Sequence, residues 1–334
     1  MRILVTGHTG FKGSWLSLML FSKGHEVFGI ALPPEKKGIF EKANISRVLR
    51  KNSFLDIRDK RQVEEEISRI EPDFIFHLAA QSLVRKSFSD FYETYSTNVL
   101  GTLNILEAVT LVPNIKGIIV VTTDKVYKNT EKEKPFLETD ELGGKDPYSS
   151  SKTMADVLTQ NWSNHHQEIP VGIARAGNVI GGGDIAENRL LPDIFKSIEN
   201  STALRIRNPN SVRPWQHVFD CLNGYVLFMS HVLKGQSEIL NFGPEPESFS
   251  RVEEVVKKTL KYFDINKWEI EPGDEKEAKF LTLDSSKAKN LLNWENKLKI
   301  NDAIRATVDW EKKSLEKQDL FQYTKLQIDQ FLQR

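Results

Sequence analysis

Short apolar runs and amphipathic segments alternate regularly through the first half of the chain, which limits the possible folds to a few. The runs are almost continuously apolar, as expected for strands buried on both faces of a parallel sheet. They cover residues 3–6, 27–31, 74–79, 118–122 and 171–174. Segments with helical spacing of apolar residues lie between them, at 11–22, 60–70, 92–109 and 147–164. We therefore predict an α/β fold with a doubly wound parallel sheet and right-handed crossovers.

A glycine-rich turn, Gly7-His8-Thr9-Gly10-Phe11-Lys12-Gly13, joins the first predicted strand to the first predicted helix. Gly7 would give the backbone the freedom that a sharp turn needs. Gly10 would let the backbone approach a pyrophosphate, and Gly13 would let the helix pack close to the sheet. The helix N-terminus then offers its amides and its dipole to the phosphates. This context predicts a Rossmann-type dinucleotide site, with cofactor contacts from Gly7, Thr9, Gly10, Phe11, Lys12 and Gly13.

The end of the second predicted strand does not identify the dinucleotide. An acidic residue is expected there to hold the adenosine ribose, but the sequence continues Ala31-Leu32-Pro33-Pro34. Glu35 lies beyond two prolines, and Lys36 and Lys37 could equally meet a 2′-phosphate. We expect NAD, and NADP stays open at this stage.

The pattern changes after about residue 175, where Gly181-Gly182-Gly183-Asp184 interrupts the alternation. Helix-like stretches follow near 252–263, 285–292 and 302–316, and the polar tail could form a last helix. We predict a dinucleotide-binding domain at 1–176 and a smaller substrate-binding lobe at 177–334. Segments near 214–243 are expected to pack back onto the first domain.

Composition excludes several classes of function. The 46 basic and 46 acidic side chains cancel, so no surface for nucleic acid is predicted. The single cysteine, Cys221, rules out an internal disulfide framework and argues against a metal site built on cysteines. The chain opens with Met1-Arg2-Ile3-Leu4-Val5, without a charged-then-apolar leader, and has no long apolar run. We expect a cytoplasmic protein with no membrane partner and no metal.

A tyrosine and a lysine four residues apart, Tyr148 and Lys152, begin the predicted helix at 147–164. Residues at this spacing share a helix face. A phenol ionises near pH 10, and a nearby ammonium should lower its pKa. The pair could then take a hydroxyl proton while hydride leaves the same carbon for a nicotinamide.

The run at 118–122 ends in a hydroxyl, a carboxylate and an amine, Thr123, Asp124 and Lys125. Doubly wound sheets place their chemistry at the carboxyl ends of strands. We therefore predict a catalytic set of Thr123, Asp124, Lys125, Tyr148 and Lys152; the alternative for the first three is a polar strand exit.

These motifs together resemble the extended short-chain dehydrogenase/reductase family over nearly the whole chain. The segments that carry the resemblance are the Gly7–Gly13 turn, His77-Leu78-Ala79-Ala80, Thr97-Asn98-Val99-Leu100-Gly101-Thr102 and Tyr148 with Lys152. Within the family the chain most resembles CDP-glucose 4,6-dehydratases, through residues 7–16, 122–127, 146–152, 175–184 and 213–218.

The resemblance implies a reaction in three stages with a tightly held NAD. The glucose unit is oxidised at C4, water is lost across C5 and C6, and the hydride returns to C6. Tyr148 would be the C4 base, Lys152 would hold the nicotinamide ribose, and Thr123 would bond the C4 oxygen. Related dTDP-glucose dehydratases carry Asp-Glu where this chain has Asp124-Lys125. We expect Asp124 to protonate the leaving hydroxyl and Lys125 to act near C5, although the roles could be exchanged.

Further contacts are implied by the resemblance or by the charge of the substrate. The cofactor should also meet Asp56, Ile57, Leu78, Ala79, Ala80 and Thr122. A nucleoside diphosphate needs cations or N–H groups, and the expected substrate contacts are Gln81, Arg85, Asn178, Arg189, Arg205, Arg213 and His217. For each arginine the alternative is a structural or solvated ion pair, and for Asp56 it is a helix cap.

Other functions remain compatible with the residues. A sugar-nucleotide 4-epimerase or 4-dehydrogenase would need Tyr148 and Lys152 but not Asp124 and Lys125. The dehydratase could prefer dTDP- or GDP-linked glucose. A non-catalytic NAD-sensing protein on this fold is a remote alternative. By resemblance we expect a homodimer or homotetramer.

Overall fold

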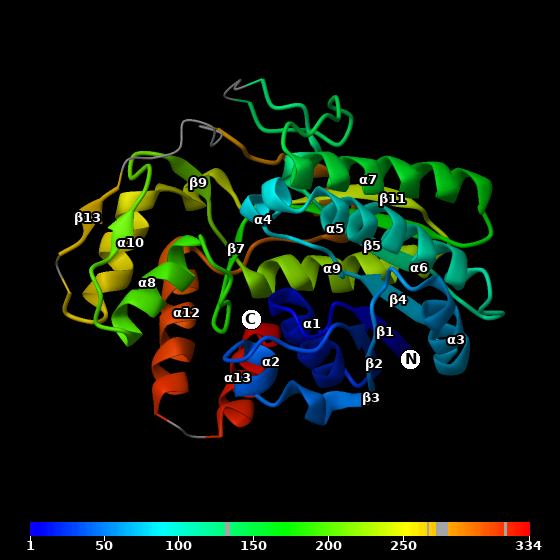
Figure 1. Ribbon diagram of the computed structural model, residues 1–334, viewed down its shortest axis with the longest axis horizontal. Coiled ribbons are helices and arrows are strands. Elements are labelled where there is room, and N and C mark those ends of the chain that lie inside the picture. The colour runs from blue at the N-terminus through cyan, green and yellow to red at the C-terminus, as the bar shows by residue number, and fades with distance from the viewer. Residues whose placement is uncertain (131–133, 266, 272–279, 317–318) are drawn as a thin grey trace.

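In the computed structural model, which describes residues 1–130, 134–265, 267–271, 280–316 and 319–334, a parallel sheet organises the chain (Figure 1). Among these residues, seven strands pair in the order β11-β6-β5-β4-β1-β2-β3, and every pairing is parallel. Their bounds are β1 Arg2–Thr6, β2 Glu26–Ala31, β3 Leu49–Phe54, β4 Phe74–His77, β5 Ile118–Thr123, β6 Val171–Ala176 and β11 Glu238–Phe242. The predicted α/β fold with a doubly wound parallel sheet is confirmed.

Helices cover both faces of this sheet, because successive strand residues point to opposite sides. Ile3 and Val5 of β1 belong to one apolar core, and Leu4 between them belongs to the other. The first core includes side chains of α1 (Phe11–Ser22) and α9 (Val218–Val232). The second includes side chains of α3 (Lys60–Ile70), α6 (Gly101–Val109) and α7 (Pro147–His165).

Short elements connect the large ones in the N-terminal half. They are α2 Ile39–Lys42, η1 Ile45–Val48, α4 Val84–Ser89, α5 Phe91–Tyr95, η2 Ser96–Leu100 and η3 Asp124–Val126. The predicted helix at 92–109 is thus divided into α5, one π-helical turn η2, and α6. The predicted helices at 11–22 and 60–70 are confirmed with their bounds.

The C-terminal half contains two-stranded pairs and helices beside the main sheet (Figure 1). β7 Val179–Ile180 pairs with β10 Gln216–His217, β8 Arg205–Ile206 with β13 Glu269–Ile270, and β9 Val212–Pro214 with β12 Phe249–Arg251. The remaining elements are α8 Leu190–Glu199, η4 Pro246–Ser248, α10 Val252–Lys261, α11 Ser286–Leu292, α12 Ile300–Leu315 and α13 Leu320–Leu332. The tail does form a helix, α13, while the division at residue 176 stays a prediction.

The segment after residue 214 returns to the large sheet. β11 extends it beside β6, and α9 packs against the face that α1 also covers. No described helix is long and apolar enough to cross a membrane. In the part of the chain that is described, no group of three or more His, Cys, Asp or Glu side chains could hold a metal ion.

Candidate active site

The glycine turn between β1 and α1 has no room for side chains at Gly7 and Gly13. Gly7 adopts φ +73°, and a Cβ atom there would lie 2.8 Å from the Ala79 nitrogen. A Cβ atom on Gly13 would lie 2.1 Å from the Gly7 oxygen. Gly10 precedes α1 without a side-chain cap, and the first turn of α1 has no acidic residue. The first amides and the positive end of the helix dipole are therefore available to an anion.

The end of β4 forms the neighbouring wall. The Thr6 hydroxyl accepts from the amides of Leu78 and Ala79, both at 3.2 Å. It also contacts His77 Nδ1 at 2.7 Å, and His77 Nε2 contacts the Thr102 hydroxyl at 3.0 Å. Both ring nitrogens of His77 are thus engaged inside the protein, and burial lowers the pKa of this residue to about 3. Leu78, Ala79 and Ala80 are half-buried beside the turn.

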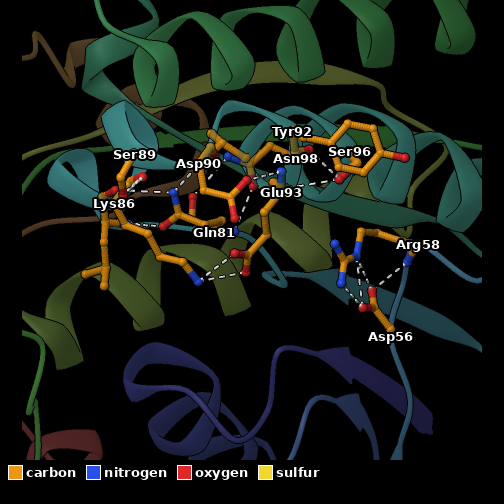
Figure 2. Close-up of polar contacts among 12 residues, drawn as sticks. Asp56, Arg58, Gln81, Lys86, Ser89, Asp90, Tyr92, Glu93, Ser96 and Asn98 are labelled. Atoms are coloured by element: carbon orange, nitrogen blue, oxygen red, sulfur yellow. Dashed lines mark hydrogen bonds and ion pairs between the residues drawn. The ribbon is translucent and has the colours of Figure 1, made fainter.

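Asp56 and Ile57 follow β3 on the side of the sheet that bears α6. Arg58 binds the Asp56 carboxylate through its backbone and its guanidinium, which lowers the pKa of Asp56 (Figure 2). Ile57 packs onto α6, where a Cβ atom on Gly101 would lie 2.6 Å from its Cδ1 atom. Asp56 and Arg58 line a cavity of about 420 Å³ together with Asp59, Tyr92, Ser96 and Leu100.

Gln81 is bound within its own loop (Figure 2). Its amide nitrogen donates to the Leu83 carbonyl and the Thr94 hydroxyl, and its amide oxygen accepts from the Leu83 nitrogen at 2.6 Å. Asn98, in the π-helical turn, accepts from the Gln81 backbone and donates to the Ser151 hydroxyl at 2.9 Å. This set of bonds fixes the loop after β4 against the first turn of α7.

The N-terminus of α7 is defined by its local sequence. Asp146 caps the helix by accepting from the Ser149 amide at 2.9 Å, and Pro147 occupies the first helical position. Tyr148 and Lys152 therefore lie one turn apart at the start of the helix. Lys152 is buried, and its ammonium donates to the Val121 carbonyl of β5 at 2.8 Å.

Three polar groups meet where β5 ends and α7 begins. The Thr123 hydroxyl donates to Asp124 Oδ1 at 2.9 Å and shares a hydrogen bond with the Tyr148 phenol. Asp124 is buried, and a Cβ atom on Gly177 would lie 3.2 Å from its Oδ2 atom. Burial raises the pKa of Asp124, although the positive charges of Lys125 and Lys12 oppose the shift. A buried carboxyl that favours its neutral form is suited to donate a proton.

The ionisation expected for Tyr148 is wrong in this structure. We expected Lys152 to lower the pKa of the phenol, but burial raises it to about 12. The cation that opposes the rise is Arg189, and the hydrogen bond with Thr123 does so more strongly. Lys152 is itself buried, which lowers its pKa to about 8. The sequence spacing did not reveal that Lys152 would be buried and Tyr148 half-buried.

Lys12 extends from the glycine turn toward the predicted catalytic groups. Its ammonium lies 3.5 Å from the Tyr225 hydroxyl of α9 and 5.8 Å from the centre of that ring. Its charge also acts on Asp124 and Lys152. Lys125 is half-buried at the end of β5, next to Asp124. The structure thus brings together Lys12, Thr123, Asp124, Lys125, Tyr148, Lys152 and Arg189.

Arg189 is the predicted substrate arginine whose charge reaches the phenol. It is half-buried, donates to Asp184 Oδ2 at 2.9 Å, and its charge opposes the rise in the pKa of Tyr148 that burial causes. Arg205, by contrast, is exposed and pairs with Glu269 at 3.5 Å. Arg85 is exposed on α4, and its charge reaches Asp193 of α8.

The other predicted substrate contacts differ in exposure. Asn178 is exposed near the end of β6. Arg213 is half-buried in β9 and donates to the Val212 carbonyl at 3.1 Å. His217 is buried, and its Nδ1 atom accepts from the Phe219 amide, so it caps α9. Its pKa falls to about 3 because of burial. Contacts of these residues with a substrate stay predictions.

Sequence reasoning missed the partners that hold the site. Asp184 orients Arg189, Tyr225 lies beside Lys12, and a buried ion pair joins Asp156 to Arg175 at 2.8 Å. Asp156 could have been noticed, because it follows Lys152 by one helical turn. Arg175 lies in a buried strand, where a lone arginine is unusual.

Comparison with known proteins agrees with this geometry. The family model for GDP-mannose 4,6 dehydratase matches residues 4–307. The chain is 40% identical to the CDP-glucose 4,6-dehydratase of Salmonella typhimurium, over 99% of this chain and 96% of that protein. Among solved structures, dTDP-glucose 4,6-dehydratase from Bacillus anthracis in complex with NAD has a TM-score of 0.81 and 26% identity, covering 95% of this chain and 98% of that one.

A more distant structure shares only the fold. UDP-glucose-4-epimerase from Stenotrophomonas maltophila has a TM-score of 0.85 at 21% identity, covering 95% of this chain and 99% of that one. The family match over most of the chain and the 40% identity over nearly all of it lead to one assignment. The chain belongs to the 4,6-dehydratases of the NAD-dependent epimerase/dehydratase family, within the extended short-chain dehydrogenases/reductases.

Proposed function

We propose that the chain is a CDP-glucose 4,6-dehydratase, which converts CDP-glucose into CDP-4-keto-6-deoxyglucose and water. The observation that carries the proposal is the buried Asp124 carboxyl, linked through Thr123 to the Tyr148 phenol. Epimerisation at C4 needs only the phenol and a hydride carrier, whereas loss of water also needs a proton donor for the departing hydroxyl. The 40% identity to the Salmonella CDP-glucose enzyme supports the nucleotide.

The residues of the glycine turn fit a dinucleotide. Gly7 and Gly13 leave no space for side chains, and α1 presents an uncapped N-terminus. When bound there, NAD would supply the acceptor for the C4 hydride and the donor that returns it to C6. We favour NAD over NADP because the Bacillus anthracis relative was solved with NAD.

Tyr148 would take the proton of the C4 hydroxyl. Its phenol is linked to Thr123, so the same pair could hold the C4 oxygen as an alcohol and then as a ketone. Because the phenol strongly resists ionisation, it needs a cation nearby, and Arg189 is placed to supply it. Lys152 would hold the nicotinamide ribose.

Asp124 would protonate the C6 hydroxyl as it leaves. Once C4 is a ketone, the C5 proton is acidic, and Lys125 would remove it or stabilise the resulting enolate. A lysine that acts as a base must be neutral at that moment. When hydride returns to C6, a proton returns to C5, and this proton balances the one that Tyr148 took from the C4 hydroxyl. The proton taken from C5 balances the one given to the C6 oxygen, so the overall change is the loss of one water.

Incubation with CDP-glucose tests the proposal directly. We expect a product lighter by one water that absorbs in alkali, as 4-keto-6-deoxy sugars do. CDP-, dTDP-, GDP- and UDP-glucose should be compared at equal concentration, and CDP-glucose should give the highest kcat/KM. A product of unchanged mass would indicate an epimerase instead. Binding of NAD without turnover of any sugar nucleotide would contradict the enzymatic assignment.

Exchange of solvent deuterium at C5 tests the role of Lys125. If Lys125 is the base, Lys125→Ala should slow deuterium incorporation while oxidation at C4 continues. Exchange at the wild-type rate would remove Lys125 from this role. The expected homodimer or homotetramer stays a prediction, which light scattering of the purified protein would test.

A further inference from the structure

Three buried polar residues form a row across the sheet beneath the catalytic groups. Thr122 of β5 is in register with Arg175 of β6, and Arg175 is in register with Asn241 of β11. Each stands one residue before the end of its strand. Thr123, which bonds the Tyr148 phenol, follows directly after this row.

Asp156 of α7 binds two members of the row. Its Oδ2 atom accepts from the Thr122 hydroxyl and from Arg175 Nε, both at 2.9 Å. Its Oδ1 atom accepts from Arg175 Nη2 at 2.8 Å and from Gln160 Nε2 at 2.7 Å. The carboxylate therefore has four donors and a two-pronged arginine partner, and Asp156 and Arg175 are 0% and 1% exposed. Such a pair fixes both position and charge.

Hydrogen bonds also hold the part of the Arg175 guanidinium that does not contact Asp156. Arg175 Nη1 donates to the Tyr127 hydroxyl at 2.9 Å and to the Glu138 carbonyl at 3.0 Å. The Tyr127 hydroxyl in turn donates to Asn241 Oδ1 at 2.7 Å. Removing one member of this ion pair would strongly destabilise the protein, because the remaining charge would be buried without compensation.

The spacing along α7 connects this pair to the active site. Tyr148, Lys152 and Asp156 follow one another at four-residue intervals, so they lie on one face of the helix. Lys152 bonds the carbonyl of Val121, and Asp156 bonds the side chain of Thr122. Two consecutive residues of β5 thus hold two consecutive turns of α7.

We propose that Asp156, locked by Arg175, is a positioning residue for Lys152. It fixes the register of α7 on β5, and it supplies the buried negative charge that keeps the lysine protonated. The proposal rests on the proposed function only in treating Lys152 as part of the active site. The geometry around Asp156 is independent of which sugar nucleotide is turned over.

The charges around Lys152 give the expected direction. Asp156 raises the pKa of the lysine, and Lys12 of α1 lowers it. His77 of β4 also faces Lys152, and burial keeps the pKa of this histidine near 3, so it is neutral at working pH. Tyr148 lies one turn away, with its pKa raised to about 12. Asp156 is therefore the anion in this set, and its loss should bring the pKa of Lys152 below about 8.

The test is a direct titration of Lys152. In protein labelled with ¹³C,¹⁵N-lysine, the Nζ shift of Lys152 is followed against pH and assigned by its disappearance in Lys152→Met. We expect Asp156→Asn to lower the midpoint by about one pH unit or more. The alkaline limb of kcat/KM for CDP-glucose should move the same way. A folded Asp156→Asn protein with the wild-type lysine midpoint would overturn the proposal, whatever substrate the enzyme uses.

Two further variants separate positioning from general destabilisation. Tyr127→Phe removes a partner of Arg175 but keeps the Asp156 charge, so we expect a lower Tm with an unchanged Lys152 midpoint. If Asp156→Asn does not fold, Asp156→Asn combined with Arg175→Met leaves neither charge alone in the interior. That double variant should still lower the lysine midpoint, and a wild-type midpoint would count against the proposal. An equal midpoint shift in Tyr127→Phe would also contradict it.

Discussion

Tyr148 is held in a form that resists ionisation, because the residue is half-buried and desolvation raises the pKa of its phenol to about 12. We predict that Tyr148→Phe lowers kcat by about 10²–10⁴-fold, because the C4 hydroxyl then loses its proton acceptor. The loss should be seen in the single-turnover rate of C4 oxidation, measured as formation of reduced nicotinamide. Tyr262→Phe is the matched control, since Tyr262 is 38% exposed at the end of α10 and is not among the predicted site residues. Near-normal oxidation by Tyr148→Phe would remove the phenol from catalysis.

The role proposed for Asp124 opposes the contribution of this residue to stability. Burial raises the pKa of its carboxyl, so between the unfolded and folded pKa values the native state binds more protons than the unfolded state. Its contribution to stability is therefore lost as pH rises through that interval. We predict that Asp124→Asn raises Tm at neutral pH while abolishing elimination, because an amide cannot supply the proton.

Stopped reactions of Asp124→Asn should accumulate the 4-keto sugar with its C6 hydroxyl intact. The measurements are product mass spectra together with thermal unfolding at pH 5 and pH 8. A variant that eliminates water at the wild-type rate would exclude Asp124 as the acid. A Tm below wild type at both pH values would contradict the stability argument.

The glycines near the two ends of α1 differ in how much space a side chain would have. A Cβ atom at Gly13 would collide with the Gly7 backbone at 2.1 Å, whereas at Gly24 nothing lies within 4 Å and only φ +81° opposes a side chain. We predict that Gly13→Ala costs about 3 kcal/mol or more and abolishes NAD binding. Gly24→Ala should cost about 1–2 kcal/mol and leave NAD binding unchanged. Urea unfolding and NAD titration measure both, and equal effects would mean the turn is not a tight cofactor cradle.

The apolar spacing of the sequence predicted the long elements of the first half. The helices at 11–22 and 60–70 were predicted with their bounds, as segments with helical spacing between apolar runs. β3 was harder to recognise, since Leu49–Phe54 is polar and lies at the edge of the sheet. The π-helical turn at Ser96–Leu100 has no repeat of apolar residues by which the sequence could indicate it. Its position depends on the hydrogen bonds of Asn98 to Gln81 and Ser151.

The site residues that belong to short sequence motifs were predictable, whereas the contacts between segments distant in the sequence were not. Tyr148, Lys152 and the end of β5 are named by the sequence, and the structure gathers them. The Asp156–Arg175 pair joins α7 to β6, and only the register between elements reveals it. The wrong expectation for the pKa of Tyr148 has the same origin, because burial is set by the whole fold and not by neighbours along the chain.

At the scale of the whole molecule, one buried acid connects the sheet to the C-terminal helices. Asp220 of α9 is 0% exposed, and its carboxylate accepts from the amides of Lys297 and Leu298 at 2.7 and 3.2 Å. The Asp220 carbonyl accepts from Trp294 Nε1 at 3.0 Å. The stretch before α12 is thereby fixed to α9, which packs on the large sheet. Opening this contact would expose the first apolar core, to which Trp294 and Leu298 belong.

Burial raises the pKa of Asp220 to about 7, although the two amides oppose the rise. The folded chain therefore binds a proton that the unfolded chain has already lost above about pH 4. By linkage, the stabilisation that protonated Asp220 gives the wild-type protein is lost as pH rises toward about 7.

Asp220→Asn removes the titration but leaves one amide facing an NH₂ group, so the variant should be less stable than wild type at pH 5. The free energy of unfolding of the variant minus that of the wild type should then become more positive by about 2–3 kcal/mol between pH 5 and pH 8. Urea unfolding across that range measures the difference, and a flat difference would show that Asp220 is already ionised in the folded protein at pH 5.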